Sequence, residues 1–153
     1  AEKRRELKTF LEPYRENGGA AIEIEGPDLV LPPQPALSLG MVLHELATNA
    51  VKYGALASPT GRIQVRWDFV DAEGEARLRF VWTESGGPKV SAPPRKGFGT
   101  VVIERFMAAA FGGKVGSEFL PGGFRWTLEI PAEHLLSAAA LQPRPLGFRP
   151  ATR

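Results

Sequence analysis

Apolar side chains recur at helical spacing in three segments of the chain. The spacing predicts helices over residues 7–17, about 35–52 and about 100–111, and a glycine stands within two residues of each expected end. Pro35 is placed to open the second helix. The second helix is expected to bury Leu39, Val42, Leu43, Leu46 and Ala50. The third is expected to bury Val102, Ile103, Phe106, Met107 and Ala110.

Apolar and polar residues alternate in other segments, which predicts strands near residues 20–25, 63–69, 78–82, 114–119 and 124–130. Glycine-containing turns separate two pairs of these strands, at residues 71–74 and 121–123. The strands are amphipathic rather than apolar on both faces. We therefore expect a two-layer α/β sandwich, in which helices cover one face of a sheet of about five strands.

Composition narrows the class of protein. The 153 residues suit one domain with its own core. The sequence contains neither a run of 18 apolar residues nor a signal peptide, so we expect no membrane contact of this segment. A net charge of +2 gives no argument for nucleic acid. Cysteine is absent and there are two histidines, so a disulfide framework or a zinc site is not expected. The lack of cysteine fits a cytoplasmic protein.

The composition changes after Pro131. Residues 133–153 contain three prolines and three arginines, with Glu133 as the one acidic residue. We expect a domain over residues 1–132 and a tail or linker over 133–153, in which residues 135–141 could form a short helix. The first residue is Ala1 rather than methionine, which suggests a segment of a longer protein.

The second predicted helix carries three polar residues on one face. At 100° per residue, Glu45, Asn49 and Lys52 fall within a narrow arc that lies away from the apolar stripe. Carboxylate and amide oxygens suit Mg²⁺ or its water ligands, and an ammonium group suits phosphate oxygens. From geometry alone, a solvated helix face explains the same arc.

A resemblance favours the first interpretation. The sequence from His44 to Ala55, HELATNAVKYGA, resembles the N box of the GHKL nucleotide-binding superfamily, which includes histidine kinases and gyrase-type ATPases. It is most similar to the HWE histidine kinases, a subgroup named for a histidine in the N box and a Trp-x-Glu element downstream. Trp82-Thr83-Glu84 supplies that element. The resemblance covers about residues 1–131 and implies a Bergerat-type fold with ATP and Mg²⁺ as ligands.

Two glycine-containing elements follow in the order that the superfamily shows. Glu84 stands where most members have an aspartate that accepts the adenine amino group; Gly86 keeps the first glycine of that box and Pro88 replaces the second. A strand-ending acid before a turn is the alternative interpretation of Glu84. The second element, Gly97-Phe98-Gly99-Thr100, precedes a helix, whose free N–H groups can bind phosphate. The lid between the two elements, Lys89 to Lys96, is short and lacks an F box, as in the subgroup.

The resemblance also implies roles for individual residues. Asn49 and Glu45 would hold Mg²⁺, and Glu45 would act on the incoming imidazole. The nucleotide would be bound by Asn49, Lys52, Tyr53, Glu84, Gly86, Gly97, Phe98, Gly99 and Thr100. His44 and Trp82 are interpreted as structural, because the phosphorylated histidine of the family lies on a separate dimerisation domain.

The resemblance implies a function and leaves rivals. The chain would transfer the γ-phosphoryl group of ATP to that histidine, and a response regulator would receive the phosphoryl group next. A serine kinase of the anti-sigma-factor type has overlapping motifs. A non-catalytic docking module with a degenerate nucleotide site is the rival of a different class, and Pro88 mildly favours it.

Overall fold

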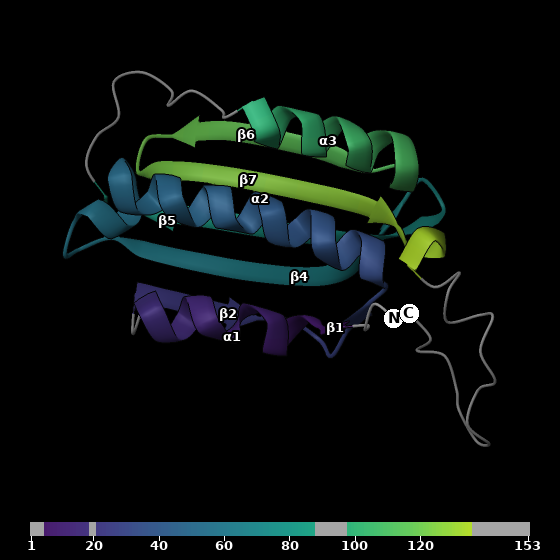
Figure 1. The fold of residues 1–153 in the computed structure, drawn as a ribbon, viewed down its shortest axis with the longest axis horizontal. Helices are drawn as coiled ribbons and strands as arrows, with labels where there is room; N and C mark the ends of the chain where they lie inside the picture. The colour runs from purple at the N-terminus through teal and green to yellow at the C-terminus, as the bar shows by residue number, and fades with distance from the viewer. Residues whose placement is uncertain (1–4, 19–20, 88–97, 136–153) are drawn as a thin grey trace.

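The computed structural model describes residues 5–18, 21–87 and 98–135 (Figure 1). In chain order the elements are β1 (Arg5–Glu6), α1 (Leu7–Gly18), β2 (Ile22–Glu25), β3 (Val30–Leu31), α2 (Pro33–Lys52), η2 (Ala55–Ala57), β4 (Arg62–Ala72), β5 (Glu75–Ser85), α3 (Phe98–Phe111), β6 (Lys114–Leu120) and β7 (Gly123–Pro131). The three predicted helices and five predicted strands are all present, with ends within about three residues of those expected. The two-residue strands β1 and β3 were not predicted, because they are too short to show an alternating pattern.

Five strands form one mixed sheet in the order β2-β4-β5-β7-β6. β2 pairs with β4 in parallel, and the remaining neighbours are antiparallel. The helices α1, α2 and α3 lie on the same face of this sheet, and the opposite face carries none of the described helices (Figure 1). The predicted two-layer α/β sandwich is confirmed.

The core lies between the helices and the covered face of the sheet. All five residues predicted for the buried stripe of α2 are buried. Opposite them lie the three largest fully buried side chains, which are aromatic residues of β5 and β7, each at most 1% exposed: Phe80, Trp82 and Trp126. Burial of side chains of this size is a main source of folding free energy. Buried residues alternate with more exposed ones along β5, and the even-numbered residues from 78 to 84 face the helices.

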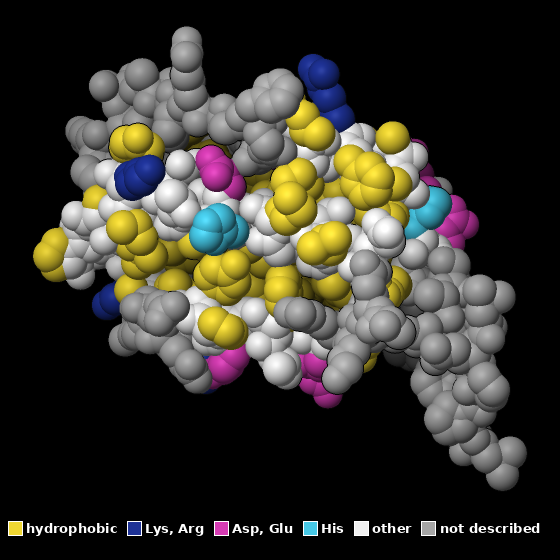
Figure 2. Space-filling model, in the orientation of Figure 1, with side chains coloured by type: hydrophobic (Ala, Val, Ile, Leu, Met, Phe, Trp, Pro, Cys, Tyr) yellow, Lys and Arg dark blue, Asp and Glu magenta, His cyan; other side chains and the backbone are white. Residues whose placement is uncertain are grey.

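The predicted inner face of α3 is partly wrong. Met107 is fully buried and Ile103 is half-buried, but Val102 is 48% exposed, Phe106 is 45% exposed and Ala110 is exposed. α3 contacts β6 at the margin of the sheet and α2 beside it, so that only a narrow stripe of the helix is covered. Its apolar pattern is wider than that stripe. Hydrophobic side chains accordingly gather on the helix-bearing surface of the molecule (Figure 2).

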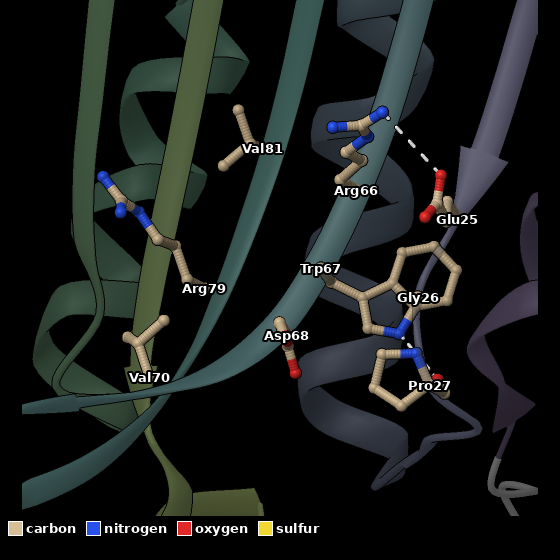
Figure 3. A pocket seen from close by; sticks show the side chains of 9 residues that line it. All are labelled: Glu25, Gly26, Pro27, Arg66, Trp67, Asp68, Val70, Arg79 and Val81. Carbon is tan, nitrogen blue, oxygen red and sulfur yellow. Dashed lines mark hydrogen bonds and ion pairs between the residues drawn. The ribbon is translucent and has the colours of Figure 1, made fainter.

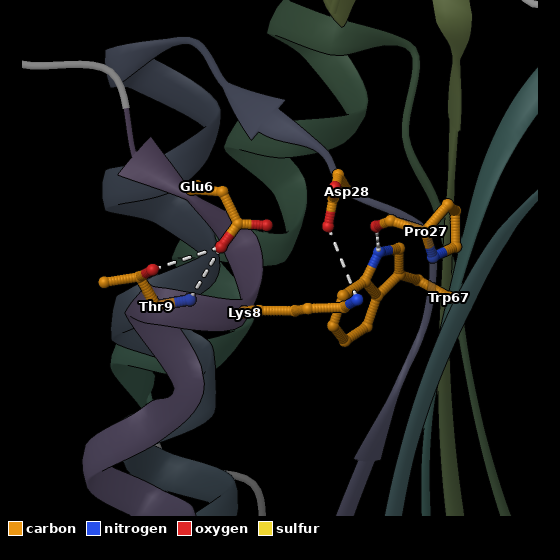
Figure 4. A network of polar contacts seen from close by, with 6 residues as sticks. All are labelled: Glu6, Lys8, Thr9, Pro27, Asp28 and Trp67. Carbon is orange, nitrogen blue, oxygen red and sulfur yellow. Dashed lines mark hydrogen bonds and ion pairs between the residues drawn. The ribbon is translucent and has the colours of Figure 1, made fainter.

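The N-terminal helix is attached to the edge of the sheet by polar contacts (Figure 4). The Glu6 carboxylate accepts hydrogen bonds from the Thr9 amide at 2.9 Å and the Thr9 hydroxyl at 3.2 Å, which satisfies a free donor of the first turn of α1. Lys8 pairs with Asp28 at 3.4 Å. The Trp67 indole donates to the Pro27 carbonyl at 2.9 Å, so the connection between β2 and β3 is bound to β4.

The described chain ends in residues 132–135, which are helical. Leu135 is 3% exposed and packs with the core. The predicted domain boundary after residue 132 stays a prediction, since residues 136–153 lie outside the described residues. Within the described part of the chain, no helix is both long and apolar enough to cross a bilayer.

Candidate functional site

Two of the elements that carry the predicted site meet at one end of the sheet. The last turn of α2 and the end of β5 lie together at the left of Figure 1. A hydrogen bond of 3.0 Å from the Ala55 amide to Glu84 Oε1 connects the residues that follow α2 with β5. The third element, α3, packs beside α2 and begins nearer the middle of the same view.

The polar face of α2 is accessible from solvent. Glu45 and Asn49 are half-buried, whereas His44 and Lys52 are exposed. The described residues contain no group of three or more histidine, cysteine or acidic side chains that could hold a metal ion. Glu45 and Asn49, one helical turn apart, suit Mg²⁺ in a different manner, because this ion commonly uses few protein ligands together with waters and phosphate oxygens.

Tyr53 ends the N-box helix. Its amide donates to the Asn49 carbonyl at 2.8 Å, and its side chain is 53% exposed. Gly54 follows with φ −113°, so this glycine does not adopt the left-handed conformation that commonly terminates helices. The need for glycine at this position has another cause, which is the neighbouring Glu84 carboxylate.

Glu84 is 5% exposed, and each of its carboxylate oxygens accepts a hydrogen bond from within the chain. Oε1 accepts the Ala55 amide and Oε2 accepts the Trp82 indole N–H at 2.9 Å. Burial raises the pKa of the Glu84 carboxyl above its usual value, while the two hydrogen bonds act in the opposite direction. The tryptophan and the glutamate of the Trp-x-Glu element are thus bonded to each other.

Three glycines near the end of β5 allow close approaches, one of them to this carboxylate. A Cβ atom at Gly54 would overlap Glu84 Oε1, and one at Gly61 would overlap the Ala55 carbonyl. Gly86 has φ +70° and leaves no room for a Cβ beside the Thr60 carbonyl. These three glycines let the segment 54–61 pack directly on the end of β5.

Part of this cluster could not be predicted from the sequence. Segment 58–61 has the composition of an ordinary turn, yet the Thr60 hydroxyl donates to the Gly86 carbonyl at 2.8 Å. Ala55, with its amide on Glu84, was also not predicted. A backbone donor carries no mark in a sequence, so only the fold identifies it.

The second glycine element is described in part. Gly97 and the lid before it lie outside the described residues, while Phe98, Gly99 and Thr100 form the first turn of α3. The sequence predicted these residues directly before the helix, whereas the helix begins at Phe98 and includes them in its first turn.

One hollow that the described residues form lies away from these elements, on the open face of the sheet (Figure 3). It has a volume of about 470 Å³ and contains none of the predicted site residues. Its cations have partners: Arg66 lies 3.8 Å from Glu25, and Arg79 lies 3.4 Å from Glu129. Nothing in this hollow points to the chemistry of the N-box face.

Comparison with curated proteins gives relatives of one kind. The chain is 39% identical over 116 residues to a blue-light-activated histidine kinase of Brucella anthropi, which covers 76% of this chain and 24% of the relative. It is 38% identical over 124 residues to the blue-light-activated histidine kinase 1 of Erythrobacter litoralis, covering 79% of this chain and 33% of the relative. The chain is a homologue of the histidine kinases. No protein-family model matches it.

Solved structures of histidine kinases share the fold. The histidine kinase domain of an Erythrobacter litoralis blue-light-activated kinase has a TM-score of 0.61 at 19% identity, over 90% of this chain and 64% of that one. The catalytic domain of the histidine kinase ThkA has a TM-score of 0.56 at 17% identity, over 84% of this chain and 95% of that one. ThkA is also known in complex with the response regulator TrrA. The chain spans a quarter to a third of the length of these curated relatives, and it shares its fold with the catalytic domain of ThkA.

Proposed function

We propose that this chain is the ATP-binding catalytic domain of a sensor histidine kinase, which transfers the γ-phosphoryl group of ATP to a histidine of a separate dimerisation domain. The observation that carries the proposal is the hydrogen bond that joins the end of α2, which bears the polar face, to the carboxylate of Glu84, while α3 packs beside α2 on the same face of the sheet. In the proposed site, the polar face of α2 would bind the metal ion and the phosphates, and the Glu84 carboxylate would face adenine. The N-terminus of α3 would bind phosphate.

The binding roles follow from the chemistry of each group. Asn49 and Glu45 would hold Mg²⁺, which would neutralise charge on the phosphates. The Lys52 ammonium and the amides of the first turn of α3 would bind phosphate oxygens. Glu84 lies on the adenine side, with Tyr53 exposed at the end of the N-box helix beside Gly54. A carboxylate there accepts the exocyclic amine of adenine and repels the carbonyl oxygen of guanine.

Catalysis would depend mainly on positioning. A ring nitrogen of the acceptor histidine attacks the γ-phosphorus, the bond to the bridging oxygen breaks, and ADP leaves. The imidazole loses its N–H proton in this transfer, and Glu45 is the candidate to accept that proton or to orient the ring. A half-buried carboxylate on the accessible face of α2 is suitably placed for a partner that enters from solvent.

The acceptor comes from outside this chain in this proposal. His44 lies in the middle of α2, and its backbone carbonyl accepts a hydrogen bond from the Thr48 hydroxyl at 2.9 Å. The His44 ring therefore cannot move in line with the γ-phosphate without unwinding the helix. We infer that the histidine-bearing domain belongs to the same longer protein or to its dimer partner. A response regulator would then accept the phosphoryl group. The complex of ThkA with the response regulator TrrA is an example of such a pair. ATP is a cytoplasmic substrate, so we place the domain in the cytoplasm.

Incubation with radiolabelled ATP and Mg²⁺ tests this function. The chain alone should acquire no label, and addition of a histidine-bearing dimerisation domain, fused or in trans, should give label on that domain. The label should be acid-labile and base-stable, as phosphohistidine is. Rapid labelling of the chain alone that His44→Ala abolishes, or acid-stable label on a serine, would contradict the proposal.

A further inference from the structure

The tryptophan of the Trp-x-Glu element has a partner that gives it a role beyond filling the core. Trp82 and Glu84 stand two positions apart in β5, so both side chains point to the helix-covered face of the sheet. There the indole N–H lies 2.9 Å from Glu84 Oε2. Trp82 is 1% exposed and Glu84 is 5% exposed, so this hydrogen bond is buried.

The other carboxylate oxygen connects this pair to the N-box helix. Glu84 Oε1 accepts the Ala55 amide, three residues beyond the end of α2, and Gly54 leaves space for the oxygen by having no Cβ. Two donors from opposite directions therefore fix the carboxylate plane. Because an ionised carboxylate has about four acceptor positions, it can still accept a further N–H.

We propose that Trp82 is a positioning residue for adenine recognition: its indole N–H orients the Glu84 carboxylate and, through it, the Gly54–Ala55 connection at the end of the N-box helix. The inference rests on the proposed function, since it concerns how that site selects adenine. It explains why a tryptophan rather than another large apolar residue suits position 82, because only its ring combines that volume with a single N–H donor.

Trp82→Phe removes the donor while keeping an aromatic ring, and Trp67→Phe is the matched control. Trp67 is 3% exposed, lies on the adjacent strand β4 and donates one hydrogen bond of 2.9 Å to a backbone carbonyl remote from the site. Both changes remove comparable volume and one indole hydrogen bond, which is buried at Trp82 and part-buried at Trp67. They differ in whether Glu84 loses a partner.

Calorimetric titration of both variants with ATP and with GTP measures the difference. Trp82→Phe should weaken ATP binding about tenfold, equivalent to about 1.4 kcal/mol, and should reduce the preference for ATP over GTP. Trp67→Phe should retain the wild-type preference. Retention of that preference by Trp82→Phe, while Glu84→Ala loses it, would overturn the role of Trp82 and leave the proposed function intact. Absence of ATP binding by the wild-type chain would overturn both.

A second variant covers the case in which Trp82→Phe fails to fold. Gly54→Ala keeps the tryptophan but places a methyl group against Glu84 Oε1, so it displaces the same carboxylate from its other side. We expect the same loss of preference for ATP. A folded Gly54→Ala protein with wild-type selectivity would show that the orientation of this carboxylate does not determine the choice of base.

Discussion

Gly86 and Gly74 share a backbone conformation but have different surroundings. Their φ angles are +70° and +79°, both in the left-handed region that L residues other than glycine rarely adopt. Gly86 lies against the Thr60 carbonyl, whereas a Cβ at Gly74 would meet nothing within 4 Å. Gly74 belongs to the hairpin turn between β4 and β5, so its glycine serves the turn alone.

This difference gives a prediction about stability. Gly86→Ala and Gly74→Ala should both lose about 1–2 kcal/mol through the left-handed backbone. Gly86→Ala should lose about 1–3 kcal/mol more, because the methyl group displaces the segment around Thr60. Urea denaturation of the two variants measures the difference in free energy of unfolding. Equal losses would show that the contact between Gly86 and Thr60 is too loose to matter.

The sequence predicted the residue types of the candidate site but not the contacts between them. The motif placed Glu84 at the end of a strand, and the structure has it there. Its burial and its bonds to Trp82 and Ala55 could not be predicted, because they depend on how close α2 comes to β5. That approach is set by Gly54, whose glycine was interpreted from the sequence as a helix end.

At the scale of elements, α2 shows why some patterns predict well and others do not. Its apolar stripe is matched by a broad sheet, so every predicted residue is buried. α3 carries an equally apolar pattern but lies at the margin, and Phe106 is left 45% exposed. A hydrophobic pattern states which face can be buried, whereas the neighbours decide how much of it is covered.

The polar face of α2 gives a prediction for Lys52. Lys52→Ala should weaken ATP binding about tenfold, or about 1.4 kcal/mol, and leave adenosine binding unchanged, because an exposed ammonium group would act on phosphates. The effect should diminish at high salt. Lys114→Ala, an exposed lysine at the start of β6, is the control. Titration with both ligands decides, and an equal loss for ATP and adenosine would refute a phosphate contact.

At the scale of the whole molecule, the architecture followed from the sequence. Amphipathic strands required a covered face and an open face, and the structure has both. The strand order was beyond the sequence pattern, since alternation does not reveal which strands are neighbours. The order matters for the site, because β5 lies centrally and thereby brings Glu84 under the end of α2.

The proposed function assigns the nucleotide and the acceptor histidine to separate domains. The nucleotide site would occupy one end of the sheet, and the acceptor histidine would belong to another domain. The chain spans a quarter to a third of the length of its curated relatives, which leaves room in such proteins for that domain. We therefore expect Mg²⁺-dependent binding of an adenine nucleotide at the face formed by Asn49 and Glu45.

Calorimetric titration of the chain with ATP, with and without EDTA, measures this Mg²⁺-dependent binding. The wild-type chain should bind one ATP in the presence of Mg²⁺ and bind it more weakly in EDTA. Asn49→Ala should lose about 1.5–3 kcal/mol of binding free energy, while Gln34→Ala, an exposed amide in the first turn of the same helix, should behave as wild type. Strong ATP binding that neither EDTA nor Asn49→Ala alters would contradict the account.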